Sequence, residues 1–251
     1  RLLFAAFPSY SASPIQYPES WSRIVAVGDA SGVQSPLSFG GFGALLRNLP
    51  RTVDGVVEAL QYDILDGKSL RGLQPYLPNL ASTWMMQRSM SAPSLEDADD
   101  APNNMIPKVF GSPLLSDGSP GPEIISELLA NTFEGMLSLD DGKGDRLLPF
   151  LQDVVRPGGL LGALSKVVVN KPELVPRIIR HVGPAPIVDW IQHVIFMLLY
   201  AAGDTILSTN TGKNLFNKST GGSDKLSFRA RRFAEALKYG SGGDFFEPPS
   251  T

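Results

Sequence analysis

The chain of 251 residues contains no cysteine, which excludes disulfide bonds, thiolate metal sites and cysteine nucleophiles. Its only histidines are His181 and His193, and two histidines at this separation form no metal-binding signature. Positive charge is not in excess either, because 22 Lys and Arg stand against 25 Asp and Glu and give a net charge of -3. Nucleic-acid-binding proteins of this size are usually basic, so the composition predicts no nucleic-acid partner.

Long apolar runs are scarce as well. The longest is Val194 to Gly203, inside a window over 186–207 that four polar residues interrupt, namely Asp189, Gln192, His193 and Asp204. A membrane span needs about 20 mostly apolar residues. We therefore expect a buried helix here, with a membrane-surface or partner-facing helix as the alternative.

The remaining pattern is that of a globular protein, since 43% of the residues are hydrophobic and 19% are charged. Segments 1–10 and 21–27 are typical of strands. From residue 44 onward apolar residues recur at helical spacing, with a break or kink expected at Pro50. The predicted helices cover 44–65, 80–90, 122–139, 147–155, 159–169, 172–182, 186–207 and 226–239, and residues 210–224 are predicted to form a polar loop.

This order predicts a mainly α fold with a small β portion, organised in three parts. Residues 1–66 hold the strand pair, a Gly-Asp pair, a glycine-rich loop and a helix. Residues 67–207 form a helical domain with a loop insertion at 91–121. Residues 208–251 add the polar loop, an amphipathic helix and a disordered tail. Because a two-stranded pair is marginal in water, the strands should pair with another segment or pack on the helices.

The most informative stretch begins where the second predicted strand ends, at Gly28-Asp29. A carboxylate at the carboxyl end of a strand lies where ligands sit in open α/β sheets. A loop rich in Gly, Ser and Pro follows, which lets the backbone approach a ligand closely, and a helix is expected to start near Gly43. The free N–H groups and the positive dipole end of such a helix favour an anionic or electron-rich ligand group.

The run GDASGVQSPLSFGGFGALLRNLPR over 28–51 resembles the second flavin-binding motif of the FAD-dependent hydroxylase, lycopene cyclase and geranylgeranyl reductase superfamily. Together with 73–90, 147–155 and 189–193, it looks like a group of chloroplast FAD-dependent oxidoreductases of plants and algae that are described as lycopene-cyclase-like. The resemblance implies the last strands of an FAD-binding α/β domain followed by a helical C-terminal region. It also implies that Asp29 binds the ribityl chain of FAD and that the flavin-side turn and loop comprise Gly28, Pro36, Gly40, Gly41 and Gly43.

That superfamily binds the ADP half of FAD with a GxGxxG sequence, which this chain does not contain. The resemblance therefore implies an FAD site that is incomplete in this chain. It suggests the C-terminal portion of a chloroplast oxidoreductase that acts on an apolar, isoprenoid- or pigment-like molecule. The alternative is a non-catalytic structural or accessory subunit of a larger complex of the photosynthetic membrane, whose partners would be other protein subunits or the membrane surface.

Four further groups of residues have a structural and a functional interpretation. Asp189 and His193 are spaced i,i+4 and should pair on a helix, with a proton relay as the alternative. The Met and aromatic residues of 84–90 should be core, with a flavin or lipid pocket as the alternative. Two basic groups should be solvated helix charges. Arg47 and Arg51 have a phosphate contact as the alternative. The second group has contact with anionic lipid or nucleic acid as the alternative; it consists of Arg229, Arg231, Arg232, Lys225 and Lys238.

Overall fold

The computed structural model describes residues 17–34, 41–90, 154–182, 184–222 and 224–244, and also residues 126, 127, 130, 131 and 134. Of these residues 76% are helical and none lies in a strand. The predicted small β portion, and with it the end of an FAD-binding α/β domain, is therefore wrong for the described part of the chain. The predicted strand over 1–10 lies outside it.

The second predicted strand, 21–27, shows why its composition misled. Its backbone groups bond to a loop and a side chain instead of a neighbouring strand. The Arg23 N–H donates to the Leu65 carbonyl at 2.9 Å, and the Ala26 carbonyl accepts from the Gln74 side-chain amide at 2.7 Å. Polar backbone groups need partners but not a particular kind of partner. A β-branched segment can therefore run extended against helices without forming a sheet.

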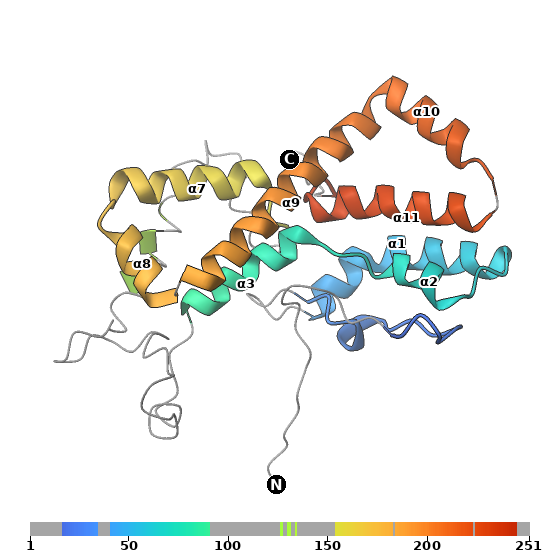
Figure 1. Cartoon of the computed structure of the whole chain (residues 1–251), viewed down its shortest axis with the longest axis horizontal. Helices are drawn as coiled ribbons and strands as arrows, with labels where there is room; N and C mark the ends of the chain where they lie inside the picture. Colours follow the sequence, from blue (N-terminus) through green and yellow to red (C-terminus); the bar gives the residue numbers. More distant parts are fainter. Residues whose placement is uncertain are drawn as a thin grey trace, which may run out of the picture.

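The described elements are helices, which fall into an N-terminal and a C-terminal group in the chain (Figure 1). The N-terminal ones are the short 3-10 helix η1 (Gly28–Ser31), α1 (Gly41–Gln61), α2 (Gly67–Leu70), η2 (Arg71–Leu73) and α3 (Pro78–Met90). The C-terminal ones are α7 (Pro157–Asn170), α8 (Leu174–Val182), α9 (Pro184–Ser208), α10 (Asn210–Thr220) and α11 (Lys225–Gly240).

Six predicted helices correspond to α1, α3, α7, α8, α9 and α11, and the predictions for 122–139 and 147–155 lie almost wholly outside the described residues. Helix α1 continues through Pro50, so it does not break there. The predicted polar loop at 210–224 is wrong, because α10 occupies most of it. Its composition of Asn, Ser, Thr and Gly favours turns, but the Thr209 hydroxyl accepts the Gly212 N–H at 3.0 Å and caps the helix.

Helix α9 crosses the molecule diagonally and connects its two ends (Figure 1). It packs on α3 and α11, with α7 and α8 at one end and α10 at the other. The core is divided into small clusters. One joins α1, η2 and α11 through Ala59, Leu73 and Phe228, and another joins α7 and α9 through Leu160 and Met197.

Helix α1 is amphipathic, but its polar side faces the core and much of its apolar side faces outward. Its inner face consists of small and polar residues at helical spacing, namely Ala44, Asn48, Arg51, Gly55 and Ala59, all of which are buried. Its apolar residues face outward and are 42–74% exposed. This α1 stripe consists of Phe42, Leu46, Leu49, Val53, Val57 and Leu60. Water-facing apolar surface of this extent marks an interaction site in a folded protein.

Candidate functional site

The Gly28-Asp29 pair forms a tight turn at the end of an extended segment. Val27 is extended, with φ -135° and ψ 158°. Gly28 and Gly32 both have positive φ, at 59° and 65°, a region that residues with a Cβ rarely adopt. The Gly32 N–H donates to the Asp29 carbonyl at 3.2 Å, and the Ser31 hydroxyl donates to the Gly28 carbonyl at 2.6 Å. The turn leaves the Asp29 side chain exposed.

The turn packs against α1, so part of the predicted flavin-binding set comes together. A Cβ at Gly28 would lie 4.0 Å from a methyl group of Leu45. Gly41 is the first residue of α1, and Gly43 lies in its first turn with open space around its Cα. The other two predicted residues, Pro36 and Gly40, lie outside the described residues.

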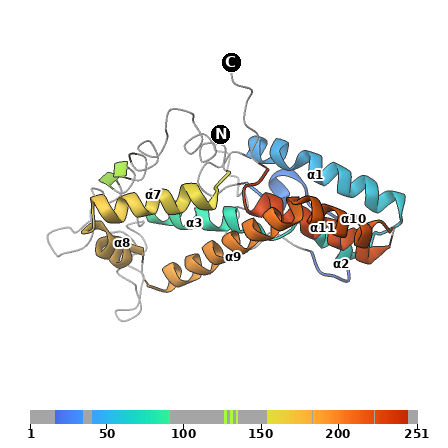
Figure 2. The same ribbon diagram turned by 90° about the horizontal axis from the view of Figure 1, so that it is seen from above.

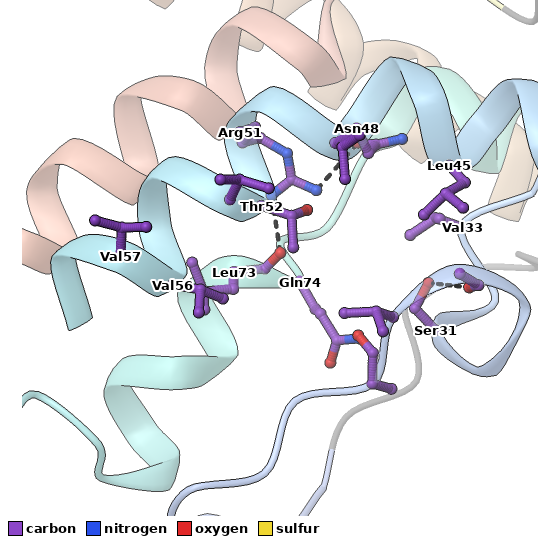
Figure 3. A pocket seen from close by; sticks show the side chains of 15 residues that line it. Ser31, Val33, Leu45, Asn48, Arg51, Thr52, Val56, Val57, Leu73 and Gln74 are labelled. Atoms are coloured by element: carbon purple, nitrogen blue, oxygen red, sulfur yellow. Dashed lines mark hydrogen bonds between the residues drawn. The ribbon is translucent and has the colours of Figure 1, made fainter. Parts of the chain in front are cut away.

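A cavity of about 310 Å³ opens between this turn and α1 (Figure 3). Its walls are mostly aliphatic, with Ala26, Val27 and Val33 on one side and α1 on the other. The α1 residues include Leu49, Val53 and Val57 of the α1 stripe, which are exposed, so the cavity opens toward the apolar surface. Its volume lies at the lower end of the range for ligand sites. It has room for a ring system or a small apolar molecule rather than for a whole dinucleotide.

Polar groups gather along the inner wall of the cavity (Figure 3). The Arg51 guanidinium donates to the Leu73 carbonyl at 2.9 Å and to the Asn48 side-chain oxygen at 3.1 Å. Burial lowers the pKa of Arg51, although the group stays cationic near neutral pH because its ordinary pKa is so high. Gln74 ties the same wall to Ala26. Nothing in the sequence pattern distinguished Gln74 as a residue of this site.

Both arginines of α1 that were predicted to be solvated have structural partners. Arg51 is buried, and Arg47 forms a two-point ion pair with Asp244, with Nε–Oδ2 and Nη2–Oδ1 distances of 2.6 and 2.8 Å. Asp244 lies in the segment that was predicted to be a disordered tail; residues 245–251 lie outside the described part. Paired in this way, Arg47 is held by its own chain rather than presented to a phosphate.

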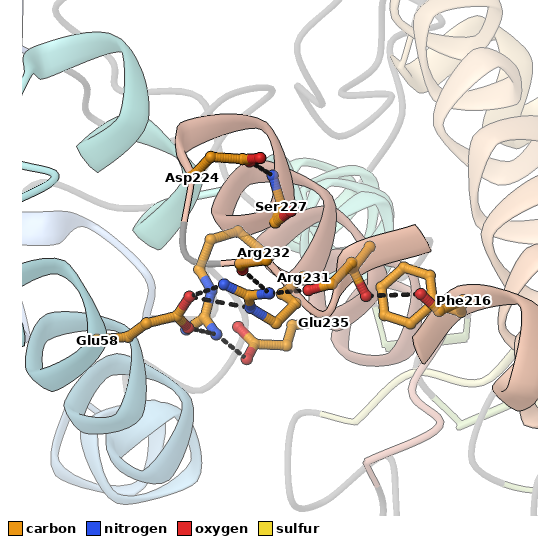
Figure 4. A network of polar contacts seen from close by, with 9 residues as sticks. Glu58, Phe216, Asp224, Ser227, Arg231, Arg232 and Glu235 are labelled. Atoms are coloured by element: carbon orange, nitrogen blue, oxygen red, sulfur yellow. Dashed lines mark hydrogen bonds and ion pairs between the residues drawn. The ribbon is translucent and has the colours of Figure 1, made fainter. Parts of the chain in front are cut away.

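The arginines of α11 were also predicted to be solvated, and each has an acidic partner instead. Arg231 and Arg232 meet Glu58 of α1 (Figure 4), and Arg229 pairs with Asp66. Arg231 bonds Glu58 with its Nε at 2.9 Å from Oε1, and Arg232 lies 3.1 Å from the other carboxylate oxygen. Arg232 also pairs with Glu235 at 2.9 Å. Burial raises the pKa of Glu235 to about 7, although the nearby Arg232 and Arg51 lower it. This cluster joins α1 to α11 and lies near Arg51, which lines the cavity.

The predicted pair on α9 is confirmed, since Asp189 Oδ2 lies 3.5 Å from His193 Nε2. The separation is long for a hydrogen bond, and the buried Nε2 has no hydrogen-bond partner. The stronger contact is one that sequence spacing could not reveal, because the Tyr76 hydroxyl lies 2.5 Å from His193 Nδ1. Burial raises the pKa of Tyr76, and Tyr200 and Asp189 raise it further, so the hydroxyl stays protonated; the tautomer of His193 decides which of the two groups donates.

The methionine-rich stretch of α3 supports the core interpretation where it is described. Met85 is buried and Trp84 is half-buried, and neither lines the cavity at the Gly28 turn. No group of three or more His, Asp or Glu side chains that could hold a metal ion is present among the described residues.

Comparison of the chain with models of protein families, with curated proteins and with solved structures finds no match in any of the three.

Proposed function

We propose that this chain is the C-terminal portion of a chloroplast flavin-dependent oxidoreductase that acts on an apolar, isoprenoid- or pigment-like molecule. FAD would be held between the Gly28 turn and a second polypeptide segment that supplies the site for its ADP half. The main support for this proposal is the apolar cavity at the Gly28 turn. The cavity has space for an apolar ring, and it is lined by part of the sequence that resembles a flavin-binding motif.

The residues present fit one half of this cofactor. The Gly28 turn presents an exposed carboxylate on Asp29, which can accept hydrogen bonds from ribityl hydroxyls. The aliphatic cavity, which Gly28 lines and Asp29 does not, would keep water away from a bound ring. When bound, FAD would supply the hydride chemistry itself, and the protein would orient it and exclude water. The described residues offer no corresponding cradle for a pyrophosphate, which is why the proposal requires a second segment.

The α1 stripe supports the same arrangement. It continues the cavity wall outward through Leu49, Val53 and Val57, so a segment that covered the stripe would also close the cavity. Burial of apolar surface is favourable by about 25 cal/mol per Å², so covering the six exposed side chains of the stripe would favour binding. The covering segment and the cofactor would thus be bound by one continuous face.

The first test is the visible spectrum of the natively purified protein, followed by denaturation and measurement of released FAD. We expect roughly one FAD per chain, in keeping with a single site. Asp29→Ala should lose flavin, whereas the matched control Asp54→Ala, which removes another exposed carboxylate, should retain it. A native protein that carries no flavin would contradict the proposal.

The second candidate function is a non-catalytic accessory subunit of a larger complex, and the exposed α1 stripe favours it independently of any cofactor. In that case the natively purified chain would contain no flavin and would co-purify in constant ratio with other subunits. Substitution of Leu46 and Leu60 by Gln, two exposed leucines of the stripe, would then release the chain from the complex.

A further inference from the structure

Helix α9 presents a second outward-facing apolar surface, and it differs from the α1 stripe in length and surroundings. Six aliphatic residues at helical spacing are 41–64% exposed. This α9 stripe consists of Val188, Ile191, Ile195, Leu198, Leu199 and Ile206. No charged residue lies within it, since the acidic residues of the helix, Asp189 and Asp204, fall on its other sides.

The opposite side of α9 is occupied by the rest of the protein. Helices α3 and α11 pack on it, and it carries the buried His193 and Met197. The Trp190 indole donates to the Ser82 carbonyl of α3 at 3.1 Å. In Figure 2 the helix runs along the lower edge of the molecule, with α3 and α7 on its other side. The α9 stripe is therefore a surface that the described fold leaves uncovered.

The segment that follows α9 is basic. Residues 209–222 hold Lys213 and Lys218 with no acidic residue, and both lysines are exposed. On α10, the exposed Leu215 and Lys218 are three residues apart and share one face. The segment before α9 is not basic in the same way, because Arg177 is paired with Glu127 at 2.7 Å and the exposed Lys171 lies close in sequence to the exposed Glu173. An apolar strip followed by exposed cations has a charge pattern that suits an anionic lipid surface.

Among the described helices α9 alone is long and apolar enough, by length and composition, to cross a membrane. Its other face argues against crossing, because His193, Asp204 and their neighbours are packed against α3 and α11 and would have to enter the hydrocarbon. Only one side of the helix is apolar and free. A helix with this distribution lies in the plane of the interface with its apolar side immersed.

We propose that the α9 stripe docks in-plane on an anionic lipid surface, with Lys213 and Lys218 of the adjoining α10 contacting the head groups. This surface is separate from the cavity at the Gly28 turn, so the docking does not depend on the proposed oxidoreductase function. Either can hold without the other.

The test is flotation of the chain with vesicles of phosphatidylcholine alone and of phosphatidylcholine mixed equally with phosphatidylglycerol. We expect flotation only with the anionic vesicles, and release at high salt because the head-group contacts are exposed. The double variant Ile195→Gln/Leu199→Gln should weaken binding by about a hundredfold or more, since each aliphatic side chain contributes strongly when buried. Lys213→Gln/Lys218→Gln should weaken it by about thirtyfold.

The matched control is Leu46→Gln/Leu60→Gln on the α1 stripe, where the two leucines are as exposed as Ile195 and Leu199. It should float like the unsubstituted chain, and circular dichroism should show that both double variants keep their helices. Equal flotation with both vesicle types, no flotation with either, or equal loss in the control would overturn the proposal. So would a dimer in solution that the α9 double variant turns into a monomer while the vesicles stay unbound.

A second readout keeps the apolar surface intact. In Ile195→Trp the new indole should enter the lipid, and brominated acyl chains should quench its fluorescence beyond the quenching seen with the unsubstituted chain. Leu46→Trp provides the corresponding control on α1 and should show no added quenching. The same quenching for both positions would overturn the assignment to α9.

Discussion

The α1–α11 end of the molecule and the α7–α9 end are held together by different interactions. Between α1 and α11, Glu58 meets two arginines, Arg231 and Arg232, at a largely buried position. Between α7 and α9, the contact is aliphatic and centres on Leu160 and Met197. In the first case the inner face of α1 is already occupied by polar and small residues, which leaves its leucines and valines outside. Apolar spacing on a helix therefore does not by itself say which side faces the core.

The largest effect on stability is expected at Arg232, in the charged cluster between α1 and α11. Arg232→Ala should lower the free energy of unfolding by about 3–5 kcal/mol, because it removes the ion pair of the largely buried Glu235 and one of the two arginines that meet Glu58. Urea denaturation measures the change. Arg229→Ala is the control: Arg229 is a third exposed and pairs with Asp66 at 3.3 Å, so its loss should cost less than about 1 kcal/mol. Equal effects would mean that burial of the Glu58 cluster does not increase the contribution of its ion pairs to the free energy of unfolding.

At the apolar end, Met197→Ala should cost about 2–5 kcal/mol, since it leaves a cavity in a fully buried position. The neighbouring Leu198→Ala removes an exposed side chain and should cost well under that amount. Thermal unfolding of both variants checks the pair. A larger effect at Leu198 would place the core on the other side of α9.

The buried carboxylate of Glu235 should make the charged end sensitive to pH. Its pKa is about 7 in the folded protein, against an ordinary value of 4.5, so the folded state binds more protons than the unfolded state between these values. Stability contributed by this group is complete below about pH 4.5 and is lost as the pH rises toward 7, by about 1–3 kcal/mol. Glu235→Gln should remove this slope in urea titrations.

Asp66 provides a control of opposite sign at the same end. Burial raises its pKa, but hydrogen bonds from Lys225 and Ser69 outweigh that effect and hold the pKa at about 2. Its contribution is therefore present above about pH 4 and is lost as the pH falls toward 2. Asp66→Asn should change the acid limb of the pH profile and leave the range from 4.5 to 7 unaltered. A change in that range would mean that Glu235 is not its source.

The smallest effects should come from two glycines of α1. A Cβ at Gly55 would overlap Leu73 and Arg232, whereas one at Gly43 meets nothing within 4 Å. Gly43→Ala should stabilise the chain by about 0.5 kcal/mol through helix propensity, and Gly55→Ala should destabilise it by about 1–3 kcal/mol. Thermal unfolding distinguishes them. If the flavin proposal holds, Gly43→Ala should also reduce the FAD retained by the native protein.

Much of the helical order could be predicted from the sequence because apolar spacing and punctuation by Pro and Gly are local properties. The prediction of a strand at 21–27 was wrong because a strand depends on a non-local partner. This segment bonds to Leu65 and Gln74 instead of a neighbouring strand. The prediction of a loop at 210–224 was wrong because the turn-forming composition of α10 is outweighed by the Thr209 cap and by the packing of α10 on α9 and α11.

At the candidate site, the sequence predicted a turn at Gly28 and a helix starting at about Gly43, both of which are present. It did not predict Gln74 or the buried position of Arg51, because these depend on which residues η2 brings against α1. Tyr76 and His193 lie 117 positions apart, and no local pattern connects them.

The sequence by itself determined where most helices lie, the tight turn that glycine allows at Gly28, and the absence of thiol chemistry. Only the tertiary structure decided which face of each helix is buried. On α1 the arginines and Glu58 of the two facing helices satisfy one another inside, so the apolar residues stay outside. On α9 the inner face is covered by α3 and α11, which leaves the apolar α9 stripe exposed on the described fold. Orientation of this kind depends on long-range pairing, which is not encoded in any single segment.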